Sequence, residues 1–387
     1  MLFASISLIL LLPYCILLFY YRKSWIEIKD FIPERIYSEQ ELPFVSVIIA
    51  ARNEEENIGK CIDSLRNQTY PQSKFEVIIT NDHSTDNTVG VIESFQAKNI
   101  RVVNLADFIK NRELNSYKKK SIETALTFSQ GELILTTDAD CFAPAKWIET
   151  IVSFYLEEKP VFIASPVFFT PVSKERKISE KLLGIFQSLD FMTLQGITGA
   201  SVSKNFHSMC NGANLAYTKE AFYEVGGFRG IDEIASGDDM LLMHKIQEHY
   251  PDRIRFLKSA DAIVKTNPEK TLSAFFQQRI RWASKADKYT DYKITLVLLL
   301  VYILTAWILI LGISAFFLEN GVYLFLSSII LKTFVEWSFL LPVARFFKRE
   351  KLLWWFAPSE IFHIIYILIA GWFGKFGNYK WKGRSVK

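Results

Sequence analysis

Several classes of protein are excluded by what this sequence lacks. Its four cysteines are scattered over 387 residues, forming neither a disulfide framework nor a C-x-x-C metal site, so a reducing compartment fits best. Basic residues number 45 and acidic ones 41, which argues against nucleic acid as a partner, because nucleic-acid binders carry a concentrated basic face. Without a G-x-G-x-x-G or G-x-x-x-x-G-K-[ST] loop, neither a Rossmann dinucleotide site nor a P-loop NTPase is supported.

Hydrophobic residues, in contrast, are too abundant for an ordinary soluble domain. They make up 50% of the chain, with 22% charged residues and a mean hydropathy of +0.14. A protein buried wholly in a membrane would carry less charge. The composition therefore predicts one soluble domain together with a few lipid-embedded helices.

The first apolar run predicts an N-terminal membrane anchor over residues 1–22. Residues 2–21 are long enough to cross a hydrocarbon core of about 30 Å. No basic residue precedes this run, whereas Arg22 and Lys23 follow it directly. These flanks favour an uncleaved anchor with its C-terminal end in the cytoplasm over a cleaved signal peptide.

A C-terminal membrane region is expected over residues 292–376. Residues 294–318 and 322–341 read as two spans that return the chain to the cytoplasm. In the second span, Lys332 and Glu336 are four residues apart and can pair with each other. Two interpretations of that pair stay open: helix packing, or a polar lining for a lipid head group or sugar.

The third apolar stretch, residues 352–376, is expected to lie in or dip into the cytoplasmic leaflet. It contains Pro358 and Glu360 and begins with two tryptophans, which favour the interface. A full crossing would place the basic tail, residues 377–387 with Lys382 and Lys387, on the outer side. The positive-inside rule disfavours that arrangement.

Residues 43–291 alternate between strand-like and helix-like patterns. Strands are expected at residues 44–50, 75–80, 101–105 and 133–137, and helices at residues 57–67, from about 86, and near 121–129. This succession predicts βαβ units, and hence an α/β domain with a parallel sheet. Ligands of such sheets bind beyond the carboxyl ends of the strands.

Acidic residues follow the second and fourth predicted strands. Asp82 comes directly after the second, where it can accept hydrogen bonds from a ribose or base, while Asp86 is expected to cap the next helix. Asp138 and Asp140 follow the fourth strand. In extended backbone they point to the same side, as a site for a divalent cation, Mg²⁺ or Mn²⁺, would require.

Two further segments each allow two interpretations. Asp238 and Asp239 either cap the following helix or supply a general base beside the metal site. Arg279, Arg281 and Trp282 either anchor the chain at lipid head groups or bind a diphosphate and a ring. The two arginines are expected on different helix faces.

Taken in order, these motifs resemble the membrane-bound family 2 glycosyltransferases with a GT-A fold. The resemblance covers about residues 43–282 and rests on six matches in the expected order. They are V-S-V-I-I-A-A-R-N-E-E-x-N-I at 45–58, N-D-x-S-x-D-x-T at 81–88, D-x-D at 138–140, N-G-A-N-L-A-Y at 211–217, D-D at 238–239 and Q-x-x-R-W at 278–282.

The resemblance implies a role for each matching residue. Nucleotide or donor contacts fall to Ala51, Arg52, Glu54, Asp82, Lys118 and Asp138. The metal ligands are Asp138 and Asp140, the base is Asp239 with Asp238 beside it, and the residues closing over diphosphate and acceptor are Gln278, Arg281 and Trp282. Two positions depart from the family pattern. Tyr117 replaces a glycine before a run of three lysines, which leaves the choice among Lys118, Lys119 and Lys120 open, and Asp238 replaces a glutamate.

The implied activity is inverting, metal-dependent transfer of a sugar from a nucleotide-sugar donor, with UDP as the expected nucleotide. The implied acceptor is a lipid or glycan at the cytoplasmic face of a membrane, expected to be a bacterial inner membrane. A processive polysaccharide synthase is the alternative, although two to four spans are few for a secretion channel. A non-catalytic scaffold or nucleotide-sugar sensor is a third possibility, against which the retained metal pair and base argue.

Overall fold

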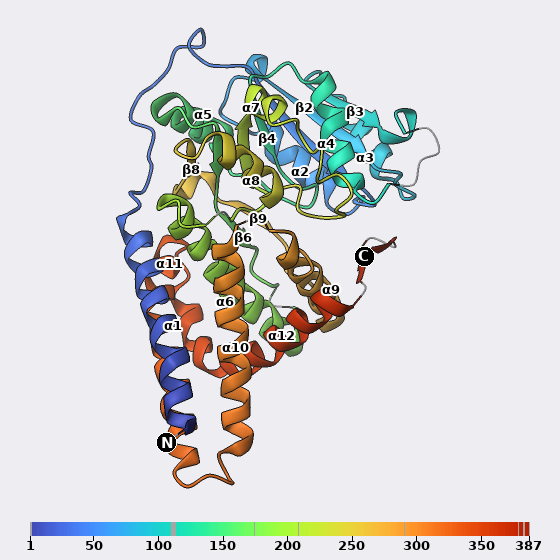
Figure 1. Cartoon of the computed structure of the whole chain (residues 1–387). Helices are drawn as coiled ribbons and strands as arrows, with labels where there is room; N and C mark the ends of the chain where they lie inside the picture. Colours follow the sequence, from blue (N-terminus) through green and yellow to red (C-terminus); the bar gives the residue numbers. More distant parts are fainter. Residues whose placement is uncertain are drawn as a thin grey trace.

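An α/β domain and a bundle of long helices make up the molecule (Figure 1). The computed structural model describes residues 2–109, 114–173, 175–207, 209–289, 291–377, 379–381 and 384–386. In Figure 1 the α/β domain lies above the long helices, with α9 and α12 near the junction between the two parts.

The central sheet has seven strands in the order β3-β2-β1-β4-β7-β5-β8. They are β1 (Val45–Ala51), β2 (Phe75–Asn81), β3 (Ile100–Asn104), β4 (Leu133–Thr136), β5 (Phe162–Ala164), β7 (Leu215–Thr218) and β8 (Ile254–Phe256). Only β7 runs antiparallel to its neighbours. A second, two-stranded sheet pairs β6 (Val167–Phe169) with β9 (Val264–Thr266). The α/β class and the mainly parallel sheet are therefore as predicted.

The predicted strands agree with the observed ones to within one residue at each end. Their Val and Ile side chains are buried on both faces, since Val47 and Ile48 are 0% and 1% exposed. That two-sided burial explains the continuous apolar runs in the sequence. Because β1, β2 and β4 are parallel, their carboxyl ends share one edge, and Asp82, Asp138 and Asp140 follow there.

Helices cover the sheet and form the junction with the long apolar helices. They are α2 (Ile58–Arg66), α3 (Thr88–Ser94), α4 (Tyr117–Phe128), α5 (Trp147–Glu158), α6 (Ile178–Ser203), α7 (Lys219–Glu224), α8 (Met240–His249) and α9 (Leu272–Ala283). The helix expected near residues 121–129 begins earlier, at Tyr117. Because of that earlier start, Lys118 lies in the first turn of α4.

The lower bundle contains α1 (Leu2–Glu27), α10 (Tyr292–Ser314) and α11 (Gly321–Phe346). Helix α6 packs against α1 and α11, an association that the sequence analysis did not anticipate. The contact is close: a Cβ on Gly199 would lie 2.6 Å from the Trp25 ring. This packing attaches the α/β domain to the helices below it.

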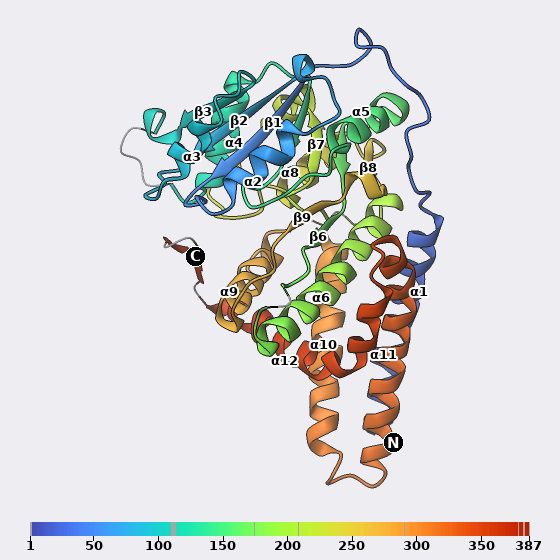
Figure 2. The same ribbon diagram turned by 180° about the vertical axis from the view of Figure 1, so that it is seen from behind.

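Four helical segments in the described part of the chain are long and apolar enough to cross a membrane: Leu2–Glu27, Tyr292–Ser314, Gly321–Phe346 and Glu350–Phe376. The last contains α12 (Phe356–Phe376), which runs obliquely to α1, α10 and α11 in both views (Figures 1 and 2). An interfacial or re-entrant course for this segment stays a prediction. Tyr379–Trp381 and Arg384–Val386 form a short antiparallel pair, whereas Lys382 and Lys387 lie outside the described residues.

The predicted pairing within α11 is confirmed. Lys332 Nζ lies 2.6 Å from a Glu336 carboxylate oxygen, and it also pairs with Glu360 of α12. Tyr14 of α1 donates a hydrogen bond to Glu336. The group thus joins three helices, and none of its members lines the large cavity described below. These contacts favour the helix-packing interpretation.

Candidate active site

One cavity of about 1500 Å³ collects most of the residues singled out by the sequence. Of the predicted site residues, those that line it are Lys118, Asp138, Asp140, Asp238, Asp239, Gln278, Arg281 and Trp282. They come from α4, the loop after β4, the start of α8, and α9. Segments far apart in the sequence thus converge at the carboxyl edge of the sheet.

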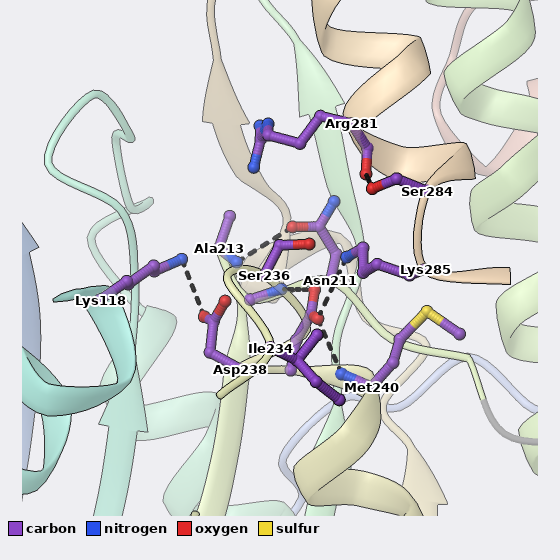
Figure 3. A network of polar contacts seen from close by, with 12 residues as sticks. Lys118, Asn211, Ala213, Ile234, Ser236, Asp238, Met240, Arg281, Ser284 and Lys285 are labelled. Carbon is purple, nitrogen blue, oxygen red and sulfur yellow. Dashed lines mark hydrogen bonds and ion pairs between the residues drawn. The ribbon is translucent and has the colours of Figure 1, made fainter. Parts of the chain in front are cut away.

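Lys118 connects the two acidic motifs. Its Nζ lies 2.8 Å from Asp138 Oδ1 and 2.9 Å from Asp238 Oδ2, and Figure 3 shows the second of these contacts. Burial alone would lower the Lys118 pKa, but the carboxylates of Asp138 and Asp238 outweigh it and raise that pKa. The lysine is therefore a permanent cation between the two motifs.

Of the three consecutive lysines, Lys118 is the one that lines the cavity. Lys119 is 1% exposed, and its Nζ donates to the backbone carbonyls of Ile231, Ile234 and Ser236 at 2.8, 2.5 and 2.9 Å. Lys120 pairs with Glu123 within the same helix. Lys119 therefore holds the loop that leads into Asp238 and Asp239, a role that the sequence did not reveal.

The residues after β4 fit a divalent cation. Ligand atoms of Asp138, Asp140 and Cys141 lie within 4.8 Å of one another. Burial raises the pKa of the Cys141 thiol, and the nearby Asp140 charge adds to this, so the thiol stays protonated at neutral pH. The two carboxylates remain as hard oxygen donors, which suit Mg²⁺ or Mn²⁺.

Asp239 serves as a helix cap and also faces the cavity. Its Oδ1 accepts from the N–H of Met240 at 2.7 Å, and its Oδ2 from the N–H of Gly212 at 3.1 Å. Lys285 Nζ lies 3.6 Å from Oδ1. Burial would raise the Asp239 pKa, but Lys285, Lys118 and the two N–H groups together lower it to about 2. The carboxylate is therefore ionised at neutral pH.

The opposite wall of the cavity is provided by α9. Arg281 lines the cavity, and in Figure 3 it lies with Lys285 on the side opposite Lys118. Arg279 also lines the cavity, but its Nη2 lies 2.7 Å from Asp190 Oδ2 of α6, and its guanidinium lies 4.2 Å from the centre of the Trp282 ring in its own helix. The predicted separation of the two arginines onto different faces is confirmed.

Four predicted nucleotide-binding residues form a neighbouring group. Arg52 donates to the carbonyl oxygens of Asp82 and His83, and the Asp82 carboxylate lies 3.0 Å from the His83 ring. Glu54 accepts from Asn57, and Ala51 is buried. Among the described residues, none of the four lines the cavity itself, whereas Asn57 and Lys60 beside them do. Their contacts with a nucleotide stay predictions.

Asp86 has a local role close to the expected one, although the N-cap residue of α3 is Asn87. Its carboxylate accepts from the N–H groups of Thr88 and Glu55. By contrast, sequence reasoning missed Lys285 and Gly212, both of which contact Asp239. Gly212 lay inside a recognised motif without an assigned role. Lys285 had no sequence signal, because it reaches Asp239 only through the turn that follows α9.

Comparisons with known proteins agree with this geometry. Residues 46–226 match the model of the family described as "Glycosyl transferase family 2". The chain is 28% identical over 270 residues to "Probable glycosyltransferase YdaM" of Bacillus subtilis, a match covering 68% of this chain and 59% of that protein. It is 25% identical over 254 residues to "Beta-monoglucosyldiacylglycerol synthase" of Synechocystis, covering 65% and 49%. The chain therefore spans less than two thirds of the length of these curated relatives.

One solved structure resembles nearly the whole chain. It is the mannosyltransferase PcManGT from Pyrobaculum calidifontis in complex with GDP-Man and Mn²⁺, with a TM-score of 0.56 and 18% identity, and the match covers 96% of this chain and 98% of that one. At this identity the likeness shows the fold. The family match assigns residues 46–226 to a family 2 glycosyltransferase domain, and the likeness to PcManGT agrees with the GT-A fold for the α/β part of the chain.

Proposed function

We propose that this protein transfers one sugar from a nucleotide-sugar donor to a hydroxyl group of a lipid or glycan at the cytoplasmic face of a membrane, with inversion at the anomeric carbon. The observation that carries the proposal is the contact of Lys118 with both Asp138 and Asp238. This contact links one predicted metal ligand to the carboxylate beside the predicted base, and all of these residues line one cavity that is also lined by apolar helices.

Two sets of residues would offset the negative charge of the donor's diphosphate. Asp138 and Asp140 would hold a divalent cation, which when bound offsets negative charge on a diphosphate. Arg281, Lys285 and Lys118 add fixed positive charge around the same cavity. That charge favours departure of a nucleoside diphosphate, whose oxygen gains a negative charge as its bond to the sugar breaks.

Asp239 is assigned the role of general base. The acceptor oxygen forms a bond to the anomeric carbon while the bond from that carbon to the diphosphate oxygen breaks. The acceptor's proton passes to the Asp239 carboxylate and then to solvent. Because Lys285 and Lys118 keep Asp239 ionised, the carboxylate is in the state that a base requires.

The relatives and the fold neighbour support this proposal, and their names differ in the substrates that they indicate. The Synechocystis relative is named for a glycolipid product, and PcManGT is described with a guanosine nucleotide sugar and Mn²⁺. The family resemblance favours UDP for this chain. A donor screen should therefore include both uridine and guanosine nucleotide sugars.

The test is a screen of nucleotide sugars with the purified protein, a membrane lipid extract and Mn²⁺, with products identified by mass spectrometry. We expect a single-sugar product from wild type and from Asp252→Asn, an exposed control, and none from Asp239→Asn, which should still bind nucleotide. Unchanged transfer by Asp239→Asn would remove Asp239 from its role. High-molecular-weight polymer from the wild type would instead show a processive synthase.

A further inference from the structure

The cavity that contains Asp239 continues between two of the apolar helices. Beyond the acidic residues, its walls include Thr295, Leu298, Leu299 and Tyr302 of α10, and Gly371 and Trp372 of α12. We call this part of the cavity the α10–α12 groove. Both helices belong to segments long and apolar enough to cross a membrane. The reaction cavity and the membrane region are therefore continuous.

The α10 residues of the groove form one face of the helix. Positions 295, 298, 299 and 302 recur at the spacing of successive helical turns, and Ile294 on the same face also lines the cavity. Leu296 points elsewhere, because it is 58% exposed and does not line the cavity. From Thr295 to Tyr302 the helix rises about 10 Å, long enough for part of an acyl chain.

A close helix contact bounds the groove at Gly371. A Cβ added there would lie 2.6 Å from the Tyr302 ring, so α12 touches α10 directly at this level. Gly374, one turn further on, is equally close to Ala283 at the end of α9. Small residues of α12 thus let it pack against both α10 and the helix that carries Arg281.

The α10–α12 groove is open at the outer surface of the two helices. Leu298, Leu299 and Trp372 are 43%, 50% and 59% exposed. On helices of this hydropathy, such side chains face lipid. At the other end of the cavity lie Asp239, Lys285 and Arg281. The space is therefore polar at the reaction centre and apolar where it meets the membrane, which is the polarity of a membrane lipid.

From this gradient we propose that the acceptor is a membrane lipid with an alcohol head group, whose hydrocarbon chain lies in the α10–α12 groove while its hydroxyl reaches Asp239. This assignment rests on the proposed function. An alcohol fits better than a phosphate at this point, because a hydroxyl must lose its proton during transfer and so needs a base such as Asp239, whereas a phosphate is already ionised at neutral pH.

Two matched variants of α10 test the occupant of the groove. Leu298→Trp fills the groove, whereas Leu296→Trp adds the same side chain to the same helix outside it, and both positions are exposed enough to accept tryptophan. Each protein is assayed for Mn²⁺-dependent nucleotide binding and for transfer of labelled sugar into the chloroform-soluble fraction of a membrane lipid extract. We expect Leu298→Trp to lower transfer at least tenfold with nucleotide affinity unchanged, and Leu296→Trp to match the wild type.

Several outcomes would overturn the proposal. Equal transfer by the two tryptophan variants would show that the groove does not hold the acceptor chain, and label found only in water-soluble glycan would show that the acceptor is not a lipid. A lipid product cleaved by mild acid, as a glycosyl phosphate is, would contradict the alcohol head group. If the wild type bound no nucleotide and released no sugar, the proposed function itself would fail, a result distinct from these.

Discussion

Arg279 and Asp190 form a buried ion pair between α9 and α6. Their side chains are 3% and 5% exposed, with Nη2 and Oδ2 2.7 Å apart. Tyr366 of α12 donates a hydrogen bond of 2.5 Å to the other carboxylate oxygen of Asp190. Arg279 is therefore attached to α6 directly and to α12 through Asp190. Because Arg281 and Trp282 lie on the same helix as Arg279, their orientation depends on this contact.

Removing one partner of this pair should destabilise the protein strongly. Asp190→Ala leaves a buried guanidinium without its counter-charge, which costs about 3–5 kcal/mol. We expect a clear fall in the thermal unfolding midpoint in detergent, and a smaller fall for Asp190→Leu combined with Arg279→Leu, in which neither charge remains. The exposed Asp63→Ala is the control. A double variant less stable than Asp190→Ala would contradict this account.

Metal-dependent donor binding should require Asp140. Replacing it by asparagine removes one of the two anionic donors, so we expect Mn²⁺ to lose most of its effect on nucleotide affinity, measured by titration calorimetry with and without the metal. Asp107→Asn, an exposed acidic residue elsewhere in the domain, should behave as the wild type. Equal nucleotide affinity with and without Mn²⁺ in the wild type would dismiss the metal site.

Lys119 should act on the reaction through the loop that it holds. Lys119→Met removes the lysine donor from three carbonyls: that of Ile231 still accepts from the Ile234 N–H, whereas those of Ile234 and Ser236 lose the donor. The cost should be about 3 kcal/mol, since a buried acceptor without a partner costs about 1–3 kcal/mol. Because the loop leads into Asp238 and Asp239, we expect turnover to fall more than nucleotide affinity does.

Lys120→Met is the matched control for Lys119→Met, since Lys120 lies on the same helix and its side chain pairs with Glu123 on the surface of that helix. Turnover and unfolding midpoint should both stay near wild type. If Lys119→Met lowered the unfolding midpoint but left turnover of the remaining folded protein unchanged, the lysine would be structural only, without a part in placing Asp239.

His207 should make stability depend on pH below neutrality. Its Nε2 lies 2.7 Å from the Tyr21 hydroxyl and 3.0 Å from that of Ser201, and burial lowers the pKa of His207 from 6.5 to about 4. Below pH 6.5 the unfolded chain binds a proton that the folded chain does not. The stabilisation is therefore complete above pH 6.5 and is lost as the pH falls toward 4, by about 2 kcal/mol at pH 5.

The measurement is the free energy of unfolding at pH 7 and pH 5 for the wild type and for His207→Gln. Other groups titrate in this range, but they are shared by both proteins, so the difference between them isolates the histidine. We expect the wild type to lose about 2 kcal/mol more than the variant. Identical losses would show that His207 is not buried in its neutral form.

The sequence by itself determined the alternating α/β domain, the acidic motifs after its strands and the apolar segments that flank it. These features depend on local patterns, because a buried parallel strand needs a continuous apolar run and a membrane helix needs length. The order of the motifs then placed Asp138, Asp140 and Asp239 in one family pattern. Asp82 and Glu54 belong to that pattern too, although they lie beside the cavity and do not line it.

Only the tertiary structure decided which side chains meet. It selected Lys118 from three adjacent lysines, paired Lys285 with Asp239, and directed the guanidinium of Arg279 to Asp190 of α6. It also set α12 across α10, so that the groove opens beside the reaction centre. Such contacts join residues distant in the chain, and their energies depend on distance and burial, which no local pattern of residues contains.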